Sequence, residues 1–169
     1  MVLIDAIIVG YNETNVDISG DKWRIYVDNL FIGEYNHSVD NKGRLAIPAK
    51  FRSSLKKGAV VTKGLDGCLF MYTEREWNKW VAKLSEMSTS QGKSRAFARL
   101  MLAGAMPVRI DVQGRINLPK YLIDFAGLKS SAVIAGLMNR LEIWDEKAWD
   151  SYKKKTEPDS EKIAEELFV

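Results

Sequence analysis

The sequence predicts an α+β fold made of two copies of one small β-rich module, with flanking helices. Three observations lead to this prediction. The segment at 40–48 reads DNKGRLAIP and returns 71 positions later, at 111–119, as DVQGRINLP. Each copy then carries short apolar runs separated by Gly turns, which is typical of strands. Each copy closes with an amphipathic pattern of helical period. A chain of 169 residues, 46% of them apolar, is long enough to bury one core or two small ones.

The repeat extends well beyond this segment. Upstream, Gly33 matches Gly104 at the same offset. Downstream, the matches continue at an offset of 72, which requires one inserted residue. These later pairs are Gly64 with Gly136, Leu65 with Leu137, Leu69 with Leu141, Tyr72 with Trp144, Glu74 with Glu146 and Trp77 with Trp149. Because a unit this long is a small domain rather than a solenoid repeat, we interpret the chain as a tandem duplication.

Each copy has the same predicted order of elements. A strand enters the Gly turn, and a second strand ends at Pro48 or Pro119. A short helical segment follows and stops near Gly58 or Gly127, as glycine often does at a helix end. Two strands come next, joined by turns at Asp66-Gly67 and at Met138-Asn139. The predicted ranges are 49–55, 60–62 and 68–72 in the first copy, and 120–125, 132–135 and 140–144 in the second.

The closing helices have recognisable starts. Thr73 and Glu76 form a capping box, and Asp145 is the expected N-cap of the second closing helix. The predicted inner faces carry Trp77, Trp80, Val81 and Leu84 in the first copy, and Trp149 and Tyr152 in the second. The stretch 87–92 reads as a linker, and a helix over 93–103 should bury Ala96, Phe97, Leu100 and Met101. Pro158 should break the chain before an acidic tail helix.

Composition narrows the function classes. The net charge of +3 is too small for binding by charge alone, but it permits a local basic face. His37 and Cys68 are the only histidine and cysteine, so we expect no metal site, no cofactor and no enzyme activity. The apolar run near the N-terminus is interrupted by Asp5 and is too short to span a bilayer, so we expect a cytoplasmic protein without membrane contact.

The Asp-x-x-Gly-Arg turn of each copy is the candidate functional feature. Asp and Gly in this pattern already make an ordinary β-turn, which is one interpretation. The turn itself has no need of Arg44 or Arg115, however, and an arginine at a hairpin tip suits phosphate or bidentate guanine contacts. The first copy is locally basic: between Asp40 and Lys57, Asp40 is the only acid and Lys42, Lys50, Arg52 and Lys56 add charge. A charged surface without a partner is the competing interpretation.

The motifs together resemble the MraZ family, over essentially all of the chain from Leu30 onward. MraZ proteins are regulators encoded at the head of the bacterial division and cell-wall gene cluster. The motifs that carry the resemblance are FxGEY at 31–35, DxKGRxxIP at 40–48, GLDGCL at 64–69, RAF at 95–97 leading to GA at 104–105, DxxGRxxLP at 111–119, AGL at 126–128 and ExW at 142–144.

The resemblance implies tandem, pseudo-symmetric, swapped-hairpin β-barrel modules of the AbrB/SpoVT type. It further implies a ring-shaped homo-oligomer that represses its own promoter by binding short direct repeats in double-stranded DNA, as a nucleoid-associated transcription factor. Arg44 and Arg115 would be the main DNA contacts, with contributions from Lys42, Lys50, Arg52 and Gln113. Asp40, Gly43, Asp111 and Gly114 would organise the loops. Because Gln113 replaces the lysine and few cations stand nearby in sequence, we expect the second copy to contribute less affinity.

These observations give a domain division. We expect modules at 30–87 and 104–152, a linker and helix at 88–103, and an acidic tail helix at 153–169. Residues 1–29 precede the family's usual beginning, and Leu30 stands where the initiator Met of the family stands. The resemblance therefore favours a start at Leu30, while the strand-like alternation at 22–27 leaves a folded extension as the alternative.

Two other functions compete with DNA binding. A scaffold protein would use the basic loops to meet an acidic protein partner. A hydrolase has very few nucleophile and base combinations to work with. The tryptophans could in principle form a platform for single-stranded nucleic acid, but their spacing favours packing between layers. We likewise expect Cys68 to be a small buried apolar residue, Asn117 to point to solvent and the acidic tail to be a solvated helix face.

Overall fold

The computed structural model describes residues 30–88 and 90–168. The N-terminal extension expected at 1–29 lies outside the described residues. The first copy contains β1 (Phe31–Ser38), β2 (Arg44–Ala46), α3 (Ala49–Arg52), β3 (Ala59–Lys63), β4 (Leu69–Thr73) and α4 (Glu74–Ser85). Helix α5 (Gly92–Ala103) leads into β5 (Met106–Val108), β6 (Arg115–Asn117), α6 (Lys120–Phe125), β7 (Ser131–Met138), β8 (Arg140–Asp145) and α7 (Glu146–Thr156). A 3-10 turn, η1 (Glu157–Asp159), and α8 (Ser160–Phe168) follow.

The strands of the two copies are interleaved. The order of the six-stranded antiparallel sheet is β1-β7-β8-β4-β3-β5, and β2 pairs with β6 as a separate ribbon. Strand β1 of the first copy pairs along its whole length with β7 of the second, while β5 of the second pairs with β3 of the first. The α+β class and the tandem, exchanged modules are therefore confirmed. Within the described residues the sheet keeps open edges at β1 and β5 and does not close into a barrel.

The pairing registers reveal a twofold relation between the copies. In the ribbon, Leu45 lies opposite Ile116, its counterpart in the repeat. In the sheet, Phe70 lies opposite Glu142, which is again its counterpart. When two strands that correspond in the repeat pair antiparallel, and equivalent residues lie opposite each other, a twofold axis passes between those two residues. The duplication therefore folds as a pseudo-dimer within one chain.

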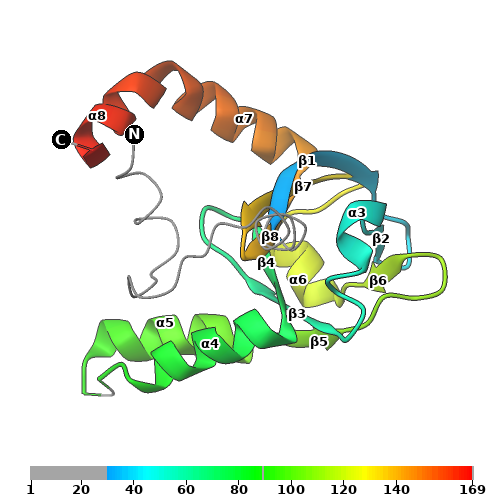
Figure 1. The fold of residues 1–169 in the computed structure, drawn as a ribbon, viewed down its shortest axis with the longest axis horizontal. Coiled ribbons are helices and arrows are strands. Elements are labelled where there is room, and N and C mark those ends of the chain that lie inside the picture. Colours follow the sequence, from blue (N-terminus) through cyan, green and yellow to red (C-terminus); the bar gives the residue numbers. More distant parts are fainter. Residues whose placement is uncertain (1–29, 89, 169) are drawn as a thin grey trace, which may run out of the picture.

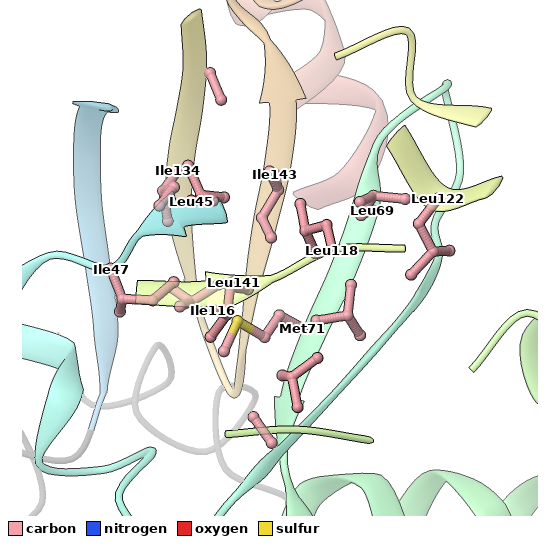
Figure 2. Packing of buried hydrophobic residues seen from close by; sticks show 14 of the residues in the cluster. Leu45, Ile47, Leu69, Met71, Ile116, Leu118, Leu122, Ile134, Leu141 and Ile143 are labelled. Atoms are coloured by element: carbon pink, nitrogen blue, oxygen red, sulfur yellow. The ribbon is translucent and has the colours of Figure 1, made fainter. Parts of the chain in front are cut away.

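The main core lies between one face of the sheet and the β2–β6 ribbon. Strands β4 and β8 alternate, so that Leu69, Met71, Leu141 and Ile143 all point to this side. The ribbon contributes side chains that are almost completely inaccessible to solvent, among them Leu45 at 0% and Ile116 at 1% exposure. Figure 2 shows these side chains converging from both copies. A single core therefore serves the two copies.

The opposite face of the sheet is covered by helices. Phe70, Tyr72, Val133 and Trp144 alternate onto this face and pack with Leu84 of α4 and Met101 of α5. The half-buried tryptophans Trp77, Trp80 and Trp149 pack against this cluster, which confirms the prediction of interlayer packing. The ribbon drawing shows α4 and α5 together near β3, and α7 extending away from the β7–β8 part of the sheet (Figure 1).

Most local predictions are confirmed. Thr73 Oγ1 accepts a hydrogen bond from the Glu76 N–H at 3.2 Å, and Asp145 accepts from the Lys147 and Ala148 amides. The turn at Asp66-Gly67 has positive φ at both residues, and Met138 has φ 58° in the other hairpin. Helix α6 has the predicted bounds, and α8 follows Pro158. Cys68 is buried and Asn117 is exposed, both as expected.

Two local predictions are wrong, and one is confirmed only in part. Helix α3 ends at Arg52 rather than at 55, because the chain continues in tight turns in which the Lys56 N–H bonds to the Ser53 carbonyl. Tyr152 lies on the inner face of α7 as predicted, with its ring packed against Trp144 and Trp149, and is still 39% exposed. Ala96 is exposed on α5. Ala96 and Tyr152 stand at the margin of an apolar face, where periodicity alone does not set the depth of burial.

None of the helices in the described part of the chain is both long enough and apolar enough to cross a bilayer.

Truncating the centre of the ribbon tests whether one core holds both copies. We expect Leu45→Ala to lower the free energy of unfolding by about 2–5 kcal/mol, because its buried volume cannot be refilled. The loss should appear in a single urea transition followed by both tryptophan fluorescence and far-UV circular dichroism. Val112→Ala, at a fully exposed position in the loop before β6, is the control and should change stability by less than about 0.5 kcal/mol. Two separate transitions in the Leu45 variant would contradict a shared core.

Candidate nucleic-acid interface

The two Asp-x-x-Gly-Arg turns lie at opposite ends of the β2–β6 ribbon. We name residues 40–43 turn 1 and residues 111–114 turn 2. Because the strands run antiparallel, turn 1 lies beside the end of β6 and turn 2 beside the end of β2. The Leu118 N–H donates to the Gly43 carbonyl and the Ile47 N–H donates to the Gly114 carbonyl, both at 2.9 Å. Figure 1 shows β2, β6 and their loops on the side of the molecule away from α5 and α8.

Each turn is closed by its own aspartate. Asp40 Oδ1 accepts the N–H groups of Lys42 at 2.9 Å and Arg44 at 3.0 Å. In turn 2, Asp111 Oδ1 accepts the N–H groups of Gln113 and Arg115, both at 2.9 Å. The turn glycines have φ 76° at position 43 and φ 80° at position 114, a left-handed conformation that other residues rarely adopt. The same geometry therefore arises twice from the same residue pattern.

Both aspartates are held in the ionised form. The backbone N–H of Arg44 is the main cause that lowers the pKa of Asp40, and the Arg44 side chain adds to it. The backbone and side chain of Arg115 lower the pKa of Asp111 in the same way. Because these pKa values are depressed in the folded state, the contribution of the carboxylates to stability is present at neutral pH. It is lost as pH falls through the folded-state pKa values.

The two arginines are held differently. Arg44 Nε donates to Asp40 Oδ2 at 2.6 Å, and its two terminal nitrogens have no hydrogen-bond partner among the described residues. Arg115 donates to Asp111 Oδ2 through both Nε at 3.0 Å and Nη2 at 2.8 Å. The Arg44 side chain is 36% exposed and the Arg115 side chain 25%. Arg44 therefore presents a fork of N–H donors to solvent, whereas Arg115 is more completely occupied by its aspartate.

The structure changes the account of the nearby cations. Arg52 follows turn 1 in sequence, but it lies against turn 2: a Cβ at Gly114 would overlap its guanidinium. Its Nε is fixed by the Ile47 carbonyl at 2.7 Å. The equivalent residue of the second copy, Ile123, lies over Gly43 in the same way. Counting along the chain assigned Arg52 to turn 1, whereas the fold places its guanidinium beside turn 2.

The remaining predicted residues are exposed around the ribbon. Lys42 and Gln113 occupy equivalent tips of the two turns, and Lys50 lies on α3. Two lysines that sequence reasoning did not select, Lys120 and Lys129, line a hollow beside turn 1 together with Lys42. No sequence pattern pointed to these lysines: the antiparallel pairing of β2 with β6 brings the end of β6, and with it Lys120, to turn 1.

The other titratable candidates, His37 and Cys68, are at least partly buried. His37 is half-buried on β1, and burial, followed by the charge of Arg52, lowers its pKa. Burial raises the pKa of the Cys68 thiol far above its ordinary value, which leaves it unreactive. In the described part of the chain, no three His, Cys, Asp or Glu side chains lie close enough to hold a metal ion.

Comparison with known proteins gives the same result for both halves of the chain. The family model described as "MraZ protein, putative antitoxin-like" matches residues 30–100 and again residues 101–169. The chain is 44% identical over 138 residues to "Transcriptional regulator MraZ" of Natranaerobius thermophilus, covering 82% of this chain and 96% of that protein. It is 45% identical to the proteins of the same name from Ligilactobacillus salivarius and Acetivibrio thermocellus. These matches cover 82% and 83% of this chain, and 97% and 98% of the relatives.

The chain belongs to the MraZ family. The double match also confirms the tandem duplication, since each copy satisfies the family model separately. The turns and the ribbon described above thus lie within the part of the chain that is shared with the MraZ relatives.

Alanine at the turn glycine tests how tightly turn 1 is packed on the second copy. A Cβ at Gly43 would lie 2.7 Å from the Leu118 carbonyl oxygen and 2.9 Å from Ile123 Cδ1. Gly67, at φ 83° with nothing near its Cβ position, is the matched control for backbone strain alone. We expect Gly67→Ala to cost about 1–2 kcal/mol of stability, which is the left-handed strain. Gly43→Ala should cost clearly more in the same urea denaturation. Equal losses of stability in Gly43→Ala and Gly67→Ala would show that Leu118 and Ile123 move aside for the new methyl group at no cost.

Proposed function

We propose that this chain is a DNA-binding transcriptional regulator whose DNA contacts are turn 1 and turn 2. The names of its MraZ relatives support the regulatory role. The observation that carries the DNA contact is the state of Arg44: its Nε is anchored to Asp40 while both terminal nitrogens stay open at the tip of a closed turn. An arginine fixed in this manner loses little conformational freedom when it binds a planar acceptor.

The proposed chemistry divides between reading and positioning. Arg44 donates two hydrogen bonds to O6 and N7 of guanine in the major groove. Lys42 and Lys50, both exposed, and Arg52, fixed beside turn 2, contact phosphates and set the affinity and register. Gln113 replaces the charge of Lys42 with an amide, which can contact either a base edge or the backbone.

We propose unequal roles for the two turns. Arg115 uses one N–H of Nη2 for Asp111, and the face formed by its other Nη2 N–H and by Nη1 stays available to a base. Arg44 is the more exposed of the two side chains, at 36% against 25%, and Lys42 adds a charge at the tip of its turn, so we assign turn 1 the larger part in sequence recognition. Turn 2 has the fixed guanidinium of Arg52 beside it, so its contribution is weighted toward the DNA backbone.

The modest net charge of +3 limits the affinity of one chain. We therefore propose that a homo-oligomer, in the form of a ring, places several chains on short direct repeats in the promoter of its own division and cell-wall operon and represses it. Linking weak contacts in this manner raises the overall affinity through effective concentration. We retain the division into modules at 30–87 and 104–152, with a connecting helix and a tail helix, as part of this proposal.

Removing the reading arginine tests the function. Arg44→Ala should lose about 1–3 kcal/mol of discrimination between the DNA upstream of the gene and a scrambled duplex, since one bidentate contact is lost. Gel shifts across a salt series measure this difference. Arg75→Ala on α4, whose side chain is 81% exposed, is the matched control and should behave as wild type. The proposal would be contradicted if wild type bound both duplexes equally and Arg44→Ala bound them as wild type does. That outcome would favour an acidic protein partner.

The spacing of repeats tests the oligomer. If several turn 1 loops bind one face of the duplex, inserting about 5 bp between two repeats should weaken binding sharply, and about 10 bp should restore it. In control probes that keep only one of the two repeats, the same insertions should change the affinity little. The mass of the free protein, measured by light scattering, gives the subunit number. Binding that is indifferent to the insertion would exclude simultaneous contact by linked subunits.

A further inference from the structure

A hollow of about 400 Å³ lies directly beside turn 1. One wall is formed by turn 1 itself and by Val39 before it. The opposite wall comes from the second copy, with an apolar part made by Leu118, Ile123 and Leu128. The hollow therefore lies at the junction of the two copies and exists only because the β2–β6 ribbon joins them.

The rim of the hollow is positively charged. Lys42 comes from the first copy, and Lys120 and Lys129 come from the second. Lys120 Nζ lies 2.9 Å from Asp124 Oδ1 in a pair whose side chains are 87% and 57% exposed, so solvent screens this attraction strongly. Asp40 is the acid that lines the hollow, and both of its carboxylate oxygens are already engaged by turn 1. An approaching anion therefore meets three ammonium groups whose charge is little offset.

The equivalent place beside turn 2 is built differently. The residue of the first copy that matches Ile123 is Arg52, and its guanidinium lies over Gly114. The residue that matches Lys120 is Ala49. At turn 2 the fixed guanidinium of Arg52 covers the glycine, whereas at turn 1 the apolar side chain of Ile123 covers it and the exposed Lys42, Lys120 and Lys129 line the hollow beside it. The two copies have thus diverged in how they supply positive charge to each other's turn.

We propose that Lys120 and Lys129 bind backbone phosphates of the DNA whose bases are read by Arg44. Turn 1 is then a composite site: the first copy supplies the reading arginine, and the second copy supplies the phosphate contacts. The apolar wall suits the deoxyribose that lies between successive phosphates, and the ammonium rim suits the phosphates themselves. This inference rests on the proposed function, because it names further contacts of the same DNA.

The test removes the two charges while keeping most of each side-chain stem. The double variant Lys120→Gln, Lys129→Gln should lower the slope of log K against log salt by about 0.9 for each lysine. Its affinity should fall equally for the specific and the scrambled duplex, so the discrimination ratio stays as in wild type. Asp124→Asn, which frees Lys120, should shift affinity in the opposite direction. Thermal melting of each variant establishes that the fold is retained.

The matched control is Lys154→Gln, Lys155→Gln, two exposed lysines on α7. This variant has the same net charge as the first double variant and should keep the wild-type slope. Equal slopes for all three proteins, with discrimination still dependent on Arg44, would overturn this inference and leave the proposed function standing. Equal loss in both double variants would also overturn it, because a general charge effect would then suffice. A wild-type protein that binds neither duplex would overturn both proposals.

Discussion

The antiparallel pairing of β2 with β6 is the contact on which the rest of the structure depends. Its centre, Leu45 opposite Ile116, lies under the sheet where both side chains are excluded from solvent. A slip of one residue would turn the apolar side chains of the ribbon outward, so burial fixes the register strongly. The same register brings the Gly43 carbonyl to the Leu118 amide and the Gly114 carbonyl to the Ile47 amide. The position of each turn is thus a consequence of core packing.

The exchange of strands makes the copies dependent on each other. Within the described residues, β1 pairs with β7 alone and β5 pairs with β3 alone. Each copy alone would leave strand edges open and would bury a small apolar surface, which a module of this size cannot tolerate. The twofold arrangement joins the halves into one sheet with one core through the two inner strands, β4 and β8, and within the described residues it leaves β1 and β5 as the edges.

The same exchange shapes the proposed function. Residues that end the ribbon strand of one copy necessarily lie beside the turn of the other, so each turn is a joint product of both copies. Once duplicated, the two positions were free to differ: the guanidinium of Arg52 lies over Gly114 of turn 2, and the apolar side chain of Ile123 lies over Gly43 of turn 1. The inequality of the turns therefore has a structural origin in the neighbouring residues and in the hydrogen bonding of Arg44 and Arg115, as well as in the replacement of Lys42 by Gln113.

The sequence by itself determined the duplication, the closed Asp-x-x-Gly-Arg turns, the hairpins and the caps at Thr73 and Asp145. These features depend on residues within a few positions of one another, where backbone geometry and hydrogen bonding leave few alternatives. Only the tertiary structure decided which strands pair across the copies, which turn Arg52 accompanies, and that Lys120 and Lys129 lie near Lys42. The physical reason is that charge counted along the chain carries no information on antiparallel pairing. That pairing carries the end of each ribbon strand to the other copy's turn.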